Sequence, residues 1–186
     1  MTDAAALPLV SITAFEALFD RMQLKAGQKV LIHGGAGGVG HVAVQLAVSA
    51  GAKVFATERG EQRLDAVAKL GAMPIDYTEE TVEAYVARAT EGKGFDMVFD
   101  TVGGSTLATS LSAIKLNGQV ATTDSIGEVD LTMAHLRGAT LHVIYMLIPL
   151  IHNHGAKRHG QILQEVKHLV ENDQVTPIVD SVFPLS

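Results

Sequence analysis

A regular alternation of short apolar runs with longer segments of helical periodicity constrains this sequence most. The short runs are rich in β-branched residues, and the apolar positions of the longer segments recur every three or four residues. The runs predict strands at Lys29–His33, Lys53–Thr57, Met73–Asp76, Phe95–Asp100, Gln119–Thr123, Leu141–Tyr145 and Pro177–Val182. Strands and helices that alternate at this spacing form right-handed βαβ units. The pattern therefore predicts an α/β fold, a doubly wound parallel sheet, with residues 1–186 forming a single domain.

The intervening segments predict helices that cover both faces of this sheet. Leu9–Leu24 is expected to pack ahead of the first strand, and Asn117-Gly118 is typical of a left-handed cap that ends a helix. The other helices are predicted at Gly38–Ala50, Glu61–Leu70, Glu79–Thr90, Ser105–Leu116 and Gln161–Val170. The nearly continuous apolar run Met97–Phe99 is typical of a strand that is buried on both faces.

Composition excludes several classes of function. The chain has 186 residues, a formal net charge of -6 and no cysteine, so it has neither a disulfide framework nor a thiolate zinc site. An acidic balance without a basic stripe argues against binding to nucleic acid. The most apolar run, Leu141–Ile151, contains His142 and Pro149 and is shorter than the ~20 residues that a membrane-spanning helix needs. We therefore expect a cytoplasmic protein with no membrane or nucleic-acid partner.

The motif most specific to function is a glycine-rich turn between the first strand and the first long helix. It has the spacing G-x-G-x-x-G at Gly35, Gly37 and Gly40. The first glycine is expected to permit the tight turn, the second to let backbone N–H groups approach a pyrophosphate, and the third to let the helix press against the strand. A strand before the motif, a helix after it and a second strand about 20 residues on are typical of the Rossmann dinucleotide-binding fold.

The end of the second strand, which should contact the adenosine ribose, supports two interpretations. Glu58 can accept hydrogen bonds from both ribose hydroxyls, which favours NAD. Arg59 and Arg63 can instead pair with a 2′-phosphate, which favours NADP. On the residues alone this choice stays open.

With these residues in view, the chain resembles the cofactor domain of the medium-chain dehydrogenase/reductase superfamily, and more narrowly its zinc-free quinone oxidoreductase (zeta-crystallin-like) branch. The resemblance runs nearly end to end. Besides Gly35–Gly40, the matching stretches are Leu7-Pro8-Leu9 with Thr13-Ala14, Leu70-Gly71-Ala72 with Asp76-Tyr77, Gly94-Phe95-Asp96 with Phe99-Asp100 and Gly103, and Gly118-Gln119-Val120.

The resemblance implies roles at matching positions. Thr13 would contact the cofactor near its nicotinamide half, and Ala36, Gly37, Gly38 and Val39 would cradle the pyrophosphate. Arg63 stands where this branch often has a basic residue for the 2′-phosphate, and Tyr77 where a tyrosine flanks that phosphate or the adenine. Further contacts are expected from the ends of the fourth and fifth strands, at Thr101, Val102, Gly103, Ser125 and Ile126. The branch tips the cofactor toward NADPH, with NAD as the alternative.

No metal site is predicted. Zinc-dependent alcohol dehydrogenases carry a metal-ligand cysteine four residues before the position of Thr13, where this chain has Leu9. His152, His154 and His159 lie close in sequence, but we interpret them as a solvated loop, and His33 and His41 beside the glycine turn as packing groups.

The resemblance implies hydride transfer from NADPH to a quinone or another activated alkene or carbonyl, and no catalytic residue is named. The alternatives are the cofactor domain of a zinc-dependent alcohol dehydrogenase or enoyl reductase, and a nucleotide-binding module without catalysis. A GroES-like domain precedes this one in the superfamily, so we expect the chain to be a fragment that is inactive alone. The apolar edge at Leu141–Tyr145 is expected to pair in a homodimer or to contact that domain.

Overall fold

The computed structural model describes residues 2–183 and has one parallel sheet as its centre. The six strands lie in the order β3-β2-β1-β4-β5-β6, and every neighbouring pair is parallel. They are β1 (Lys29–His33), β2 (Lys53–Glu58), β3 (Met73–Asp76), β4 (Phe95–Asp100), β5 (Ile114–Thr122) and β6 (Thr140–Val143). The chain starts in the middle of the sheet and winds outward in both directions. The predicted doubly wound α/β fold is therefore confirmed.

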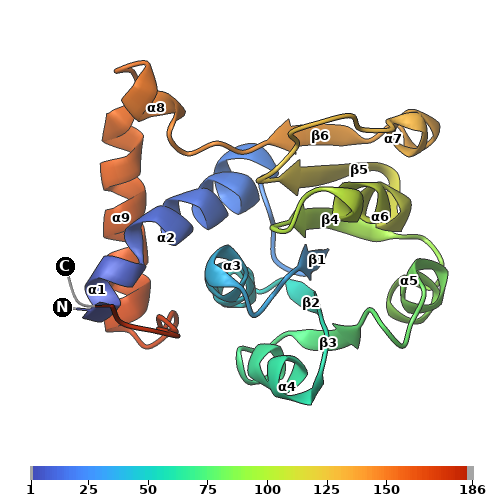
Figure 1. The fold of residues 1–186 in the computed structure, drawn as a ribbon, viewed down its shortest axis with the longest axis horizontal. Coiled ribbons are helices and arrows are strands. Elements are labelled where there is room, and N and C mark those ends of the chain that lie inside the picture. Colours follow the sequence, from blue (N-terminus) through green and yellow to red (C-terminus); the bar gives the residue numbers. More distant parts are fainter. Residues whose placement is uncertain (1, 184–186) are drawn as a thin grey trace.

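Helices cover both faces of the sheet (Figure 1). One face carries α2 (Pro8–Phe15), α3 (Gly38–Ser49), α4 (Glu61–Lys69) and α9 (Ala156–Glu171), and the other carries α5 (Val82–Thr90), α6 (Ser105–Ala113) and α7 (Thr132–Arg137). The short helices α1 (Thr2–Ala6) and α8 (Ile148–Ile151) complete the set. No helix within residues 2–183 has the length and apolar character needed to cross a bilayer.

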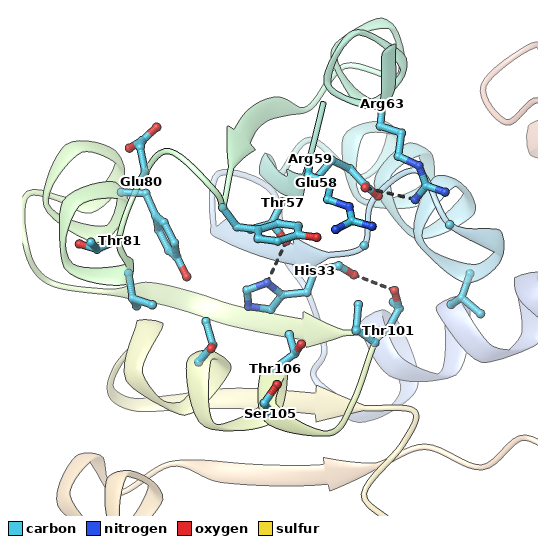
Figure 2. Close-up of a pocket in the computed structure, with 18 of the residues that line it drawn as sticks. His33, Thr57, Glu58, Arg59, Arg63, Glu80, Thr81, Thr101, Ser105 and Thr106 are labelled. Carbon is cyan, nitrogen blue, oxygen red and sulfur yellow. Dashed lines mark hydrogen bonds and ion pairs between the residues drawn. The ribbon is translucent and has the colours of Figure 1, made fainter. Parts of the chain in front are cut away.

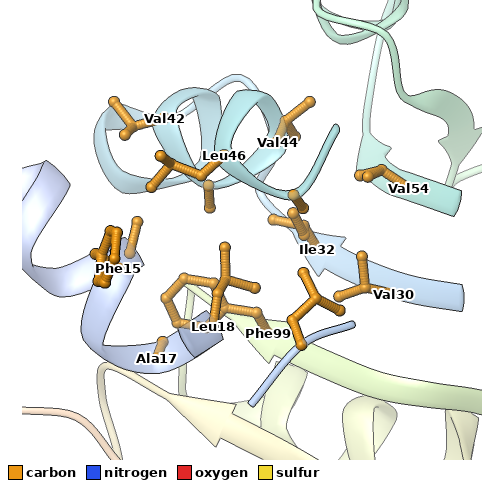
Figure 3. Close-up of a cluster of buried hydrophobic side chains, with 14 of the residues drawn as sticks. Phe15, Ala17, Leu18, Val30, Ile32, Val42, Val44, Leu46, Val54 and Phe99 are labelled. Carbon is orange, nitrogen blue, oxygen red and sulfur yellow. The ribbon is translucent and has the colours of Figure 1, made fainter. Parts of the chain in front are cut away.

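Alternation along the strands divides the core into two layers. On β1, Val30 and Ile32 point into one layer, while Leu31 points into the other. Figure 3 shows the first layer, where Ile32 and Val30 face Leu46 of α3 and Leu18. Successive side chains of a strand alternate between faces, so both faces are apolar and both need a covering of helices.

In the segment before β1, α2 continues into a π-helix, η1 (Glu16–Arg21). The helix predicted at Leu9–Leu24 therefore ends at Arg21 and changes from an α-helix to a π-helix at Glu16. Arg21 pairs with Glu16 across one wide turn, at 2.8 Å between Nη2 and Oε1. Phe15, Ala17 and Leu18 are buried in the layer that also holds α3. This segment is therefore an integral part of the core.

The predicted boundary between the helix Ser105–Leu116 and the strand Gln119–Thr123 is wrong. The helix predicted at Ser105–Leu116 ends at Ala113, and β5 begins at Ile114, because Ile114 is buried and pairs with Phe95 of β4. Asn117 does have a left-handed φ of 55°, but it lies inside β5, where the register against β4 shifts.

The strand predicted at Pro177–Val182 does not form. Backbone N–H groups at and just before this segment donate hydrogen bonds to side chains of α3. The Thr176 N–H donates to Gln45 Oε1 (2.7 Å), and the Ile178 N–H donates to His41 Nε2 (3.2 Å). The chain here runs along a helix and has no sheet edge beside it, so its apolar alternation produces no strand. The edge strand predicted at Leu141–Tyr145 is confirmed, two residues shorter at its end.

Candidate functional site

A cleft of about 950 Å³ lies at the carboxyl ends of β1, β2 and β4 (Figure 2). At the middle of the sheet the chain leaves in opposite directions, so the loops that follow neighbouring strands separate and leave a crevice. The cleft is lined by His33 at the end of β1, Glu58 at the end of β2 and Thr101 after β4. The volume is within the range of pockets that bind small organic ligands.

The glycine turn forms the wall of the cleft between β1 and α3. Gly34 has a φ of 70°, and its carbonyl accepts a hydrogen bond from the Gly37 N–H at 2.9 Å. A Cβ on Gly40 would lie 2.0 Å from the Gly34 carbonyl oxygen, and one on Gly35 would lie 2.6 Å from the Ala56 Cβ. The predicted packing role of Gly40 is confirmed. The left-handed turn residue, however, is Gly34, and Gly35 is required by its close approach to β2.

Gly37, Gly38 and Val39 line the cleft. Gly37 is the N-cap of α3, and no side chain caps the first N–H groups of this helix. A Cβ on Gly38 would meet only Val10 Cγ1, at 3.8 Å, so space is open there. Uncapped N–H groups at the positive end of a helix form an anion site when the backbone can be approached closely.

Three charged side chains surround the end of β2. Glu58 is only 4% exposed, and its Oε1 accepts the Ala36 N–H at 2.7 Å. Its other oxygen lies 3.4 Å from Nη1 of Arg63, whose side chain is mostly exposed. Arg59 lines the same part of the cleft. The carboxylate therefore points to the glycine turn, and both guanidinium groups stand beside the cleft (Figure 2).

The opposite part of the cleft has a neutral polar floor. His33 Nδ1 lies 2.9 Å from Thr57 Oγ1, and burial lowers the pKa of His33 to about 4. Tyr85 on α5 is 1% exposed, and burial, followed by the charge of Glu83, raises its pKa to about 12. Both side chains are therefore uncharged at neutral pH. His33 Nε2 and the Tyr85 hydroxyl have no protein hydrogen-bond partner.

The loop after β4 is held by a buried aspartate. Asp100 is fully buried, and its Oδ1 accepts the N–H groups of Val102 (3.0 Å) and Gly103 (2.9 Å). Burial raises the pKa of Asp100 despite these bonds. Asp100 therefore caps the turn that follows β4. A Cβ on Gly103 would lie 2.5 Å from Asp124 Cβ, so this loop also packs on the loop after β5.

The predicted binding residues divide into two groups. Those that line the cleft are Gly37, Gly38, Val39, Glu58, Arg59, Arg63, Tyr77, Thr101 and Val102. Those that do not are Thr13, Gly35, Ala36, Gly40, Gly103, Ser125 and Ile126. Thr13 is buried and donates to the Leu9 carbonyl at 2.9 Å, whereas Ile126 is 96% exposed. The contacts of both groups with a cofactor stay predictions.

Sequence reasoning missed several residues of the floor. Thr57, Thr81, Tyr85, Ser105, Thr106 and Thr109 all line the cleft. The position of Thr57 at a strand end was a usable signal. The sequence carries no such signal for Tyr85, because its place in a helical apolar pattern predicts only burial.

The sequence predicts that His33 and His41 are packing groups. His41 fits this role, since its Nδ1 lies 3.0 Å from the Gly37 carbonyl and its Nε2 accepts the Ile178 N–H. His33 lines the cleft as well. Among residues 2–183, no three His, Cys, Asp or Glu side chains are grouped closely enough to hold a metal ion.

The model of the family described as zinc-binding dehydrogenase matches residues 38–147, from the start of α3 to beyond β6. This chain belongs to that family. The chain has the fold of the superfamily's cofactor-binding domain, so the resemblance to the medium-chain dehydrogenase/reductase superfamily is confirmed.

Known proteins similar to this chain include solved oxidoreductase structures and much longer polyketide synthase proteins. An alcohol dehydrogenase superfamily protein from Novosphingobium aromaticivorans is 44% identical with a TM-score of 0.94, and the match covers 98% of this chain and 55% of that one. A quinone oxidoreductase from Pseudomonas syringae is 28% identical with a TM-score of 0.84, covering 95% and 55%. The spectinabilin polyketide synthase system protein NorB of Streptomyces orinoci is 35% identical over 176 residues, covering 94% of this chain and 8% of that protein.

This chain thus spans about half the length of the solved relatives and a small part of the polyketide synthase protein. A further solved relative, the CurK enoyl reductase, is 26% identical with a TM-score of 0.83, covering 98% of this chain and 55% of that one.

Proposed function

We propose that this chain is the NADPH-binding domain of an oxidoreductase that transfers hydride to a quinone or another activated alkene or carbonyl. The observation that carries the proposal is the cleft in which the uncapped start of α3, at Gly37–Val39, lies beside Arg59 and Arg63. A dinucleotide needs backbone amides for its pyrophosphate and a polar contact for its ribose, and both stand here in the expected order. When bound, the nicotinamide ring supplies the hydride.

The chain's own residues would bind and orient the cofactor. The N–H groups of the first turn of α3 would hold the pyrophosphate, and the lack of side chains at Gly37 and Gly38 lets it approach them. Asp100 would keep the loop at Thr101 and Val102 in place through its two backbone hydrogen bonds. These residues would therefore position the cofactor, which is the usual task of a cofactor domain.

The arrangement around Glu58 supports NADPH over NADH. A carboxylate beside a 2′-phosphate is repulsive unless it turns away and is neutralised. Here one oxygen accepts the Ala36 N–H and the other lies near Arg63, so the carboxylate is directed at the glycine turn. Arg59 and Arg63 line the cleft and can form charge-assisted bonds to a phosphate.

Nicotinamide fluorescence during titration with NADPH and with NADH tests this proposal. Arg63→Ala is expected to weaken NADPH binding roughly ten- to a hundredfold, the range for a lost bond to a charged group, and to leave NADH nearly unchanged. Arg21→Ala is the matched control, because Arg21 is half exposed, pairs with Glu16 and does not line the cleft. Equal losses for both cofactors would remove the 2′-phosphate assignment, and absence of binding by the unchanged chain would refute the proposal.

The acceptor is proposed from the relatives, which include a quinone oxidoreductase and an enoyl reductase. Both reactions deliver hydride to an electron-poor double bond, so one cofactor domain can serve either. NADPH consumption by the full protein with a benzoquinone and with a crotonyl thioester separates them. A protein that binds NADPH and reduces neither would favour a nucleotide-binding module without catalysis.

We also propose that β6 pairs with β6 of a second copy. It is one of the two edge strands of the sheet, and Val143, Tyr145 and Ile148 at and after its end are each about half exposed. An edge strand beside exposed apolar side chains favours pairing with another chain. Sedimentation of the unchanged chain and of a Val143→Lys variant tests it. A dimer that the lysine disrupts would support the proposal, and a monomer at all concentrations would refute it.

A further inference from the structure

Two buried polar side chains on α3, His41 and Gln45, bind the backbone of the segment that follows α9. The Thr176 N–H donates to Gln45 Oε1 at 2.7 Å, and the Thr176 carbonyl accepts Gln45 Nε2 at 3.0 Å. The Ile178 N–H donates to His41 Nε2 at 3.2 Å. Four residues of a helix advance about 6 Å and two residues of an extended chain advance about 6.6 Å, so the two spacings match. Pro177 lies between them and has no N–H to satisfy.

These contacts fix which ring nitrogen of His41 carries the proton. A backbone N–H can only donate, so Nε2 accepts from Ile178 and has no proton of its own. The imidazole is therefore neutral, and its one proton is on Nδ1. Nδ1 lies 3.0 Å from the Gly37 carbonyl oxygen, which can only accept. The ring thus donates to Gly37 and accepts from Ile178.

The bond to the Gly37 carbonyl acts on the amide that follows it. This carbonyl and the Gly38 N–H belong to one planar trans peptide and point in opposite directions. The carbonyl also accepts the backbone N–H of His41 at 3.0 Å, so two donors of one residue hold it. Gly37 and Gly38 both line the cleft, and two glycines in a row have wide conformational freedom. Holding the carbonyl therefore fixes the direction of the Gly38 N–H.

We propose that His41 is a positioning residue for diphosphate binding, because its Nδ1–H holds the Gly37 carbonyl and so aims the Gly38 N–H at the cleft. The backbone at Ile178 keeps the ring in the tautomer that this task needs. His41 does not itself line the cleft and acts through Gly37. The role rests on the proposed function, since a diphosphate must lie at the start of α3 for the direction of this N–H to matter.

Two substitutions separate the two bonds of the ring. His41→Asn keeps an amide N–H near the place of Nδ1 and removes the acceptor for Ile178, whereas His41→Gln keeps an acceptor near the place of Nε2 and removes the donor to Gly37. In calorimetric titration, NADPH should bind His41→Gln about five- to tenfold more weakly, the effect of one weakened hydrogen bond, and His41→Asn within about twofold of the unchanged chain. NADH should show the same difference, because it carries the same diphosphate.

Adenosine 2′-phosphate, which has no diphosphate, distinguishes positioning from a general effect on the fold. The unchanged chain and both variants should bind it equally. His135→Gln is the matched control, because His135 is exposed on α7 and does not line the cleft, and it should bind every ligand as the unchanged chain does. Equal losses of NADPH affinity in the two His41 variants, a loss with adenosine 2′-phosphate, or no loss in His41→Gln would overturn the inference.

Nitrogen-15 NMR of the His41 imidazole in the unchanged chain tests the tautomer without any substitution. A proton on Nδ1 and none on Nε2 is expected, and a proton on Nε2 would overturn the inference even if a variant failed to fold. Failure of the unchanged chain to bind NADPH and NADH would instead refute the proposed function.

Discussion

The stability of this protein should fall steeply in mild acid because of one histidine. His33 is 3% exposed, and burial lowers its pKa from 6.5 to about 4. In the unfolded chain the same imidazole takes up a proton near pH 6.5, so between pH 6.5 and 4 the unfolded state binds more protons than the native state. By linkage, the free energy of unfolding decreases as the pH falls through this window.

The size of the effect follows from the two pKa values. At pH 7 the native imidazole is deprotonated and about a quarter of the unfolded chains are protonated at this site, so the contribution is only about 0.2 kcal/mol. At pH 5 the unfolded chain is mostly protonated and the native chain is not, which costs about 2 kcal/mol, and below pH 4 the cost reaches about 3 kcal/mol. A loss of about 2 kcal/mol would move a urea midpoint by about 1 M for a slope of about 2 kcal/mol per molar.

Urea unfolding followed by circular dichroism at pH 7 and pH 5 measures this loss. The variant His33→Asn carries no group that titrates in the window, so the loss between the two pH values should be about 2 kcal/mol smaller than in the unchanged chain. All other titrating groups are common to both proteins and drop out of the comparison. If the two proteins lose the same free energy, the proton uptake is not at His33 and the reasoning is refuted.

Three further substitutions test the loops around the cleft. Gly40→Ala would put a Cβ 2.0 Å from the Gly34 carbonyl oxygen, so calorimetry should show a melting temperature lower by about 4–8 °C, for a strain of about 2 kcal/mol; an unchanged value would contradict the close approach. Gly38→Ala meets only Val10 Cγ1 at 3.8 Å and should melt within about 2 °C of the unchanged chain while binding NADPH at least about tenfold more weakly; full affinity would place the pyrophosphate elsewhere. Burial raises the pKa of Asp100, so the ionised carboxylate is less favourable in the native state than in the unfolded chain. This site therefore lowers the free energy of unfolding as the pH rises. Asp100→Asn keeps an oxygen for the loop and should cost less than about 1 kcal/mol at pH 7 in urea unfolding, and a larger loss would show that the charge itself is needed.

Local sequence patterns were sufficient where an element depends on its own residues. The strands Lys29–His33, Met73–Asp76 and Phe95–Asp100 were predicted with their observed bounds, because an apolar run between turn residues allows few other conformations. The glycine turn was equally local, since Gly37 and Gly38 are needed wherever a backbone must be approached closely. From these elements the parallel sheet and the position of the cleft followed.

Contacts between distant segments decided the rest. Residues 114–118 joined a strand because Ile114 meets Phe95, and residues 177–182 did not, because Gln45 and His41 satisfy the backbone beside them. Which way Glu58 points depends on the Ala36 N–H, 22 residues away in sequence.

The sequence by itself determined the alternation of strands and helices from Lys29 to Asp100 and the glycine turn, because both depend on residues that are neighbours along the chain. The tertiary structure alone decided that His33 and Tyr85 share the floor of one cleft. They are more than fifty residues apart, and only the packing of α5 on the sheet brings this imidazole, paired through Nδ1 alone, and this phenol, whose hydroxyl has no protein partner, to the same cavity.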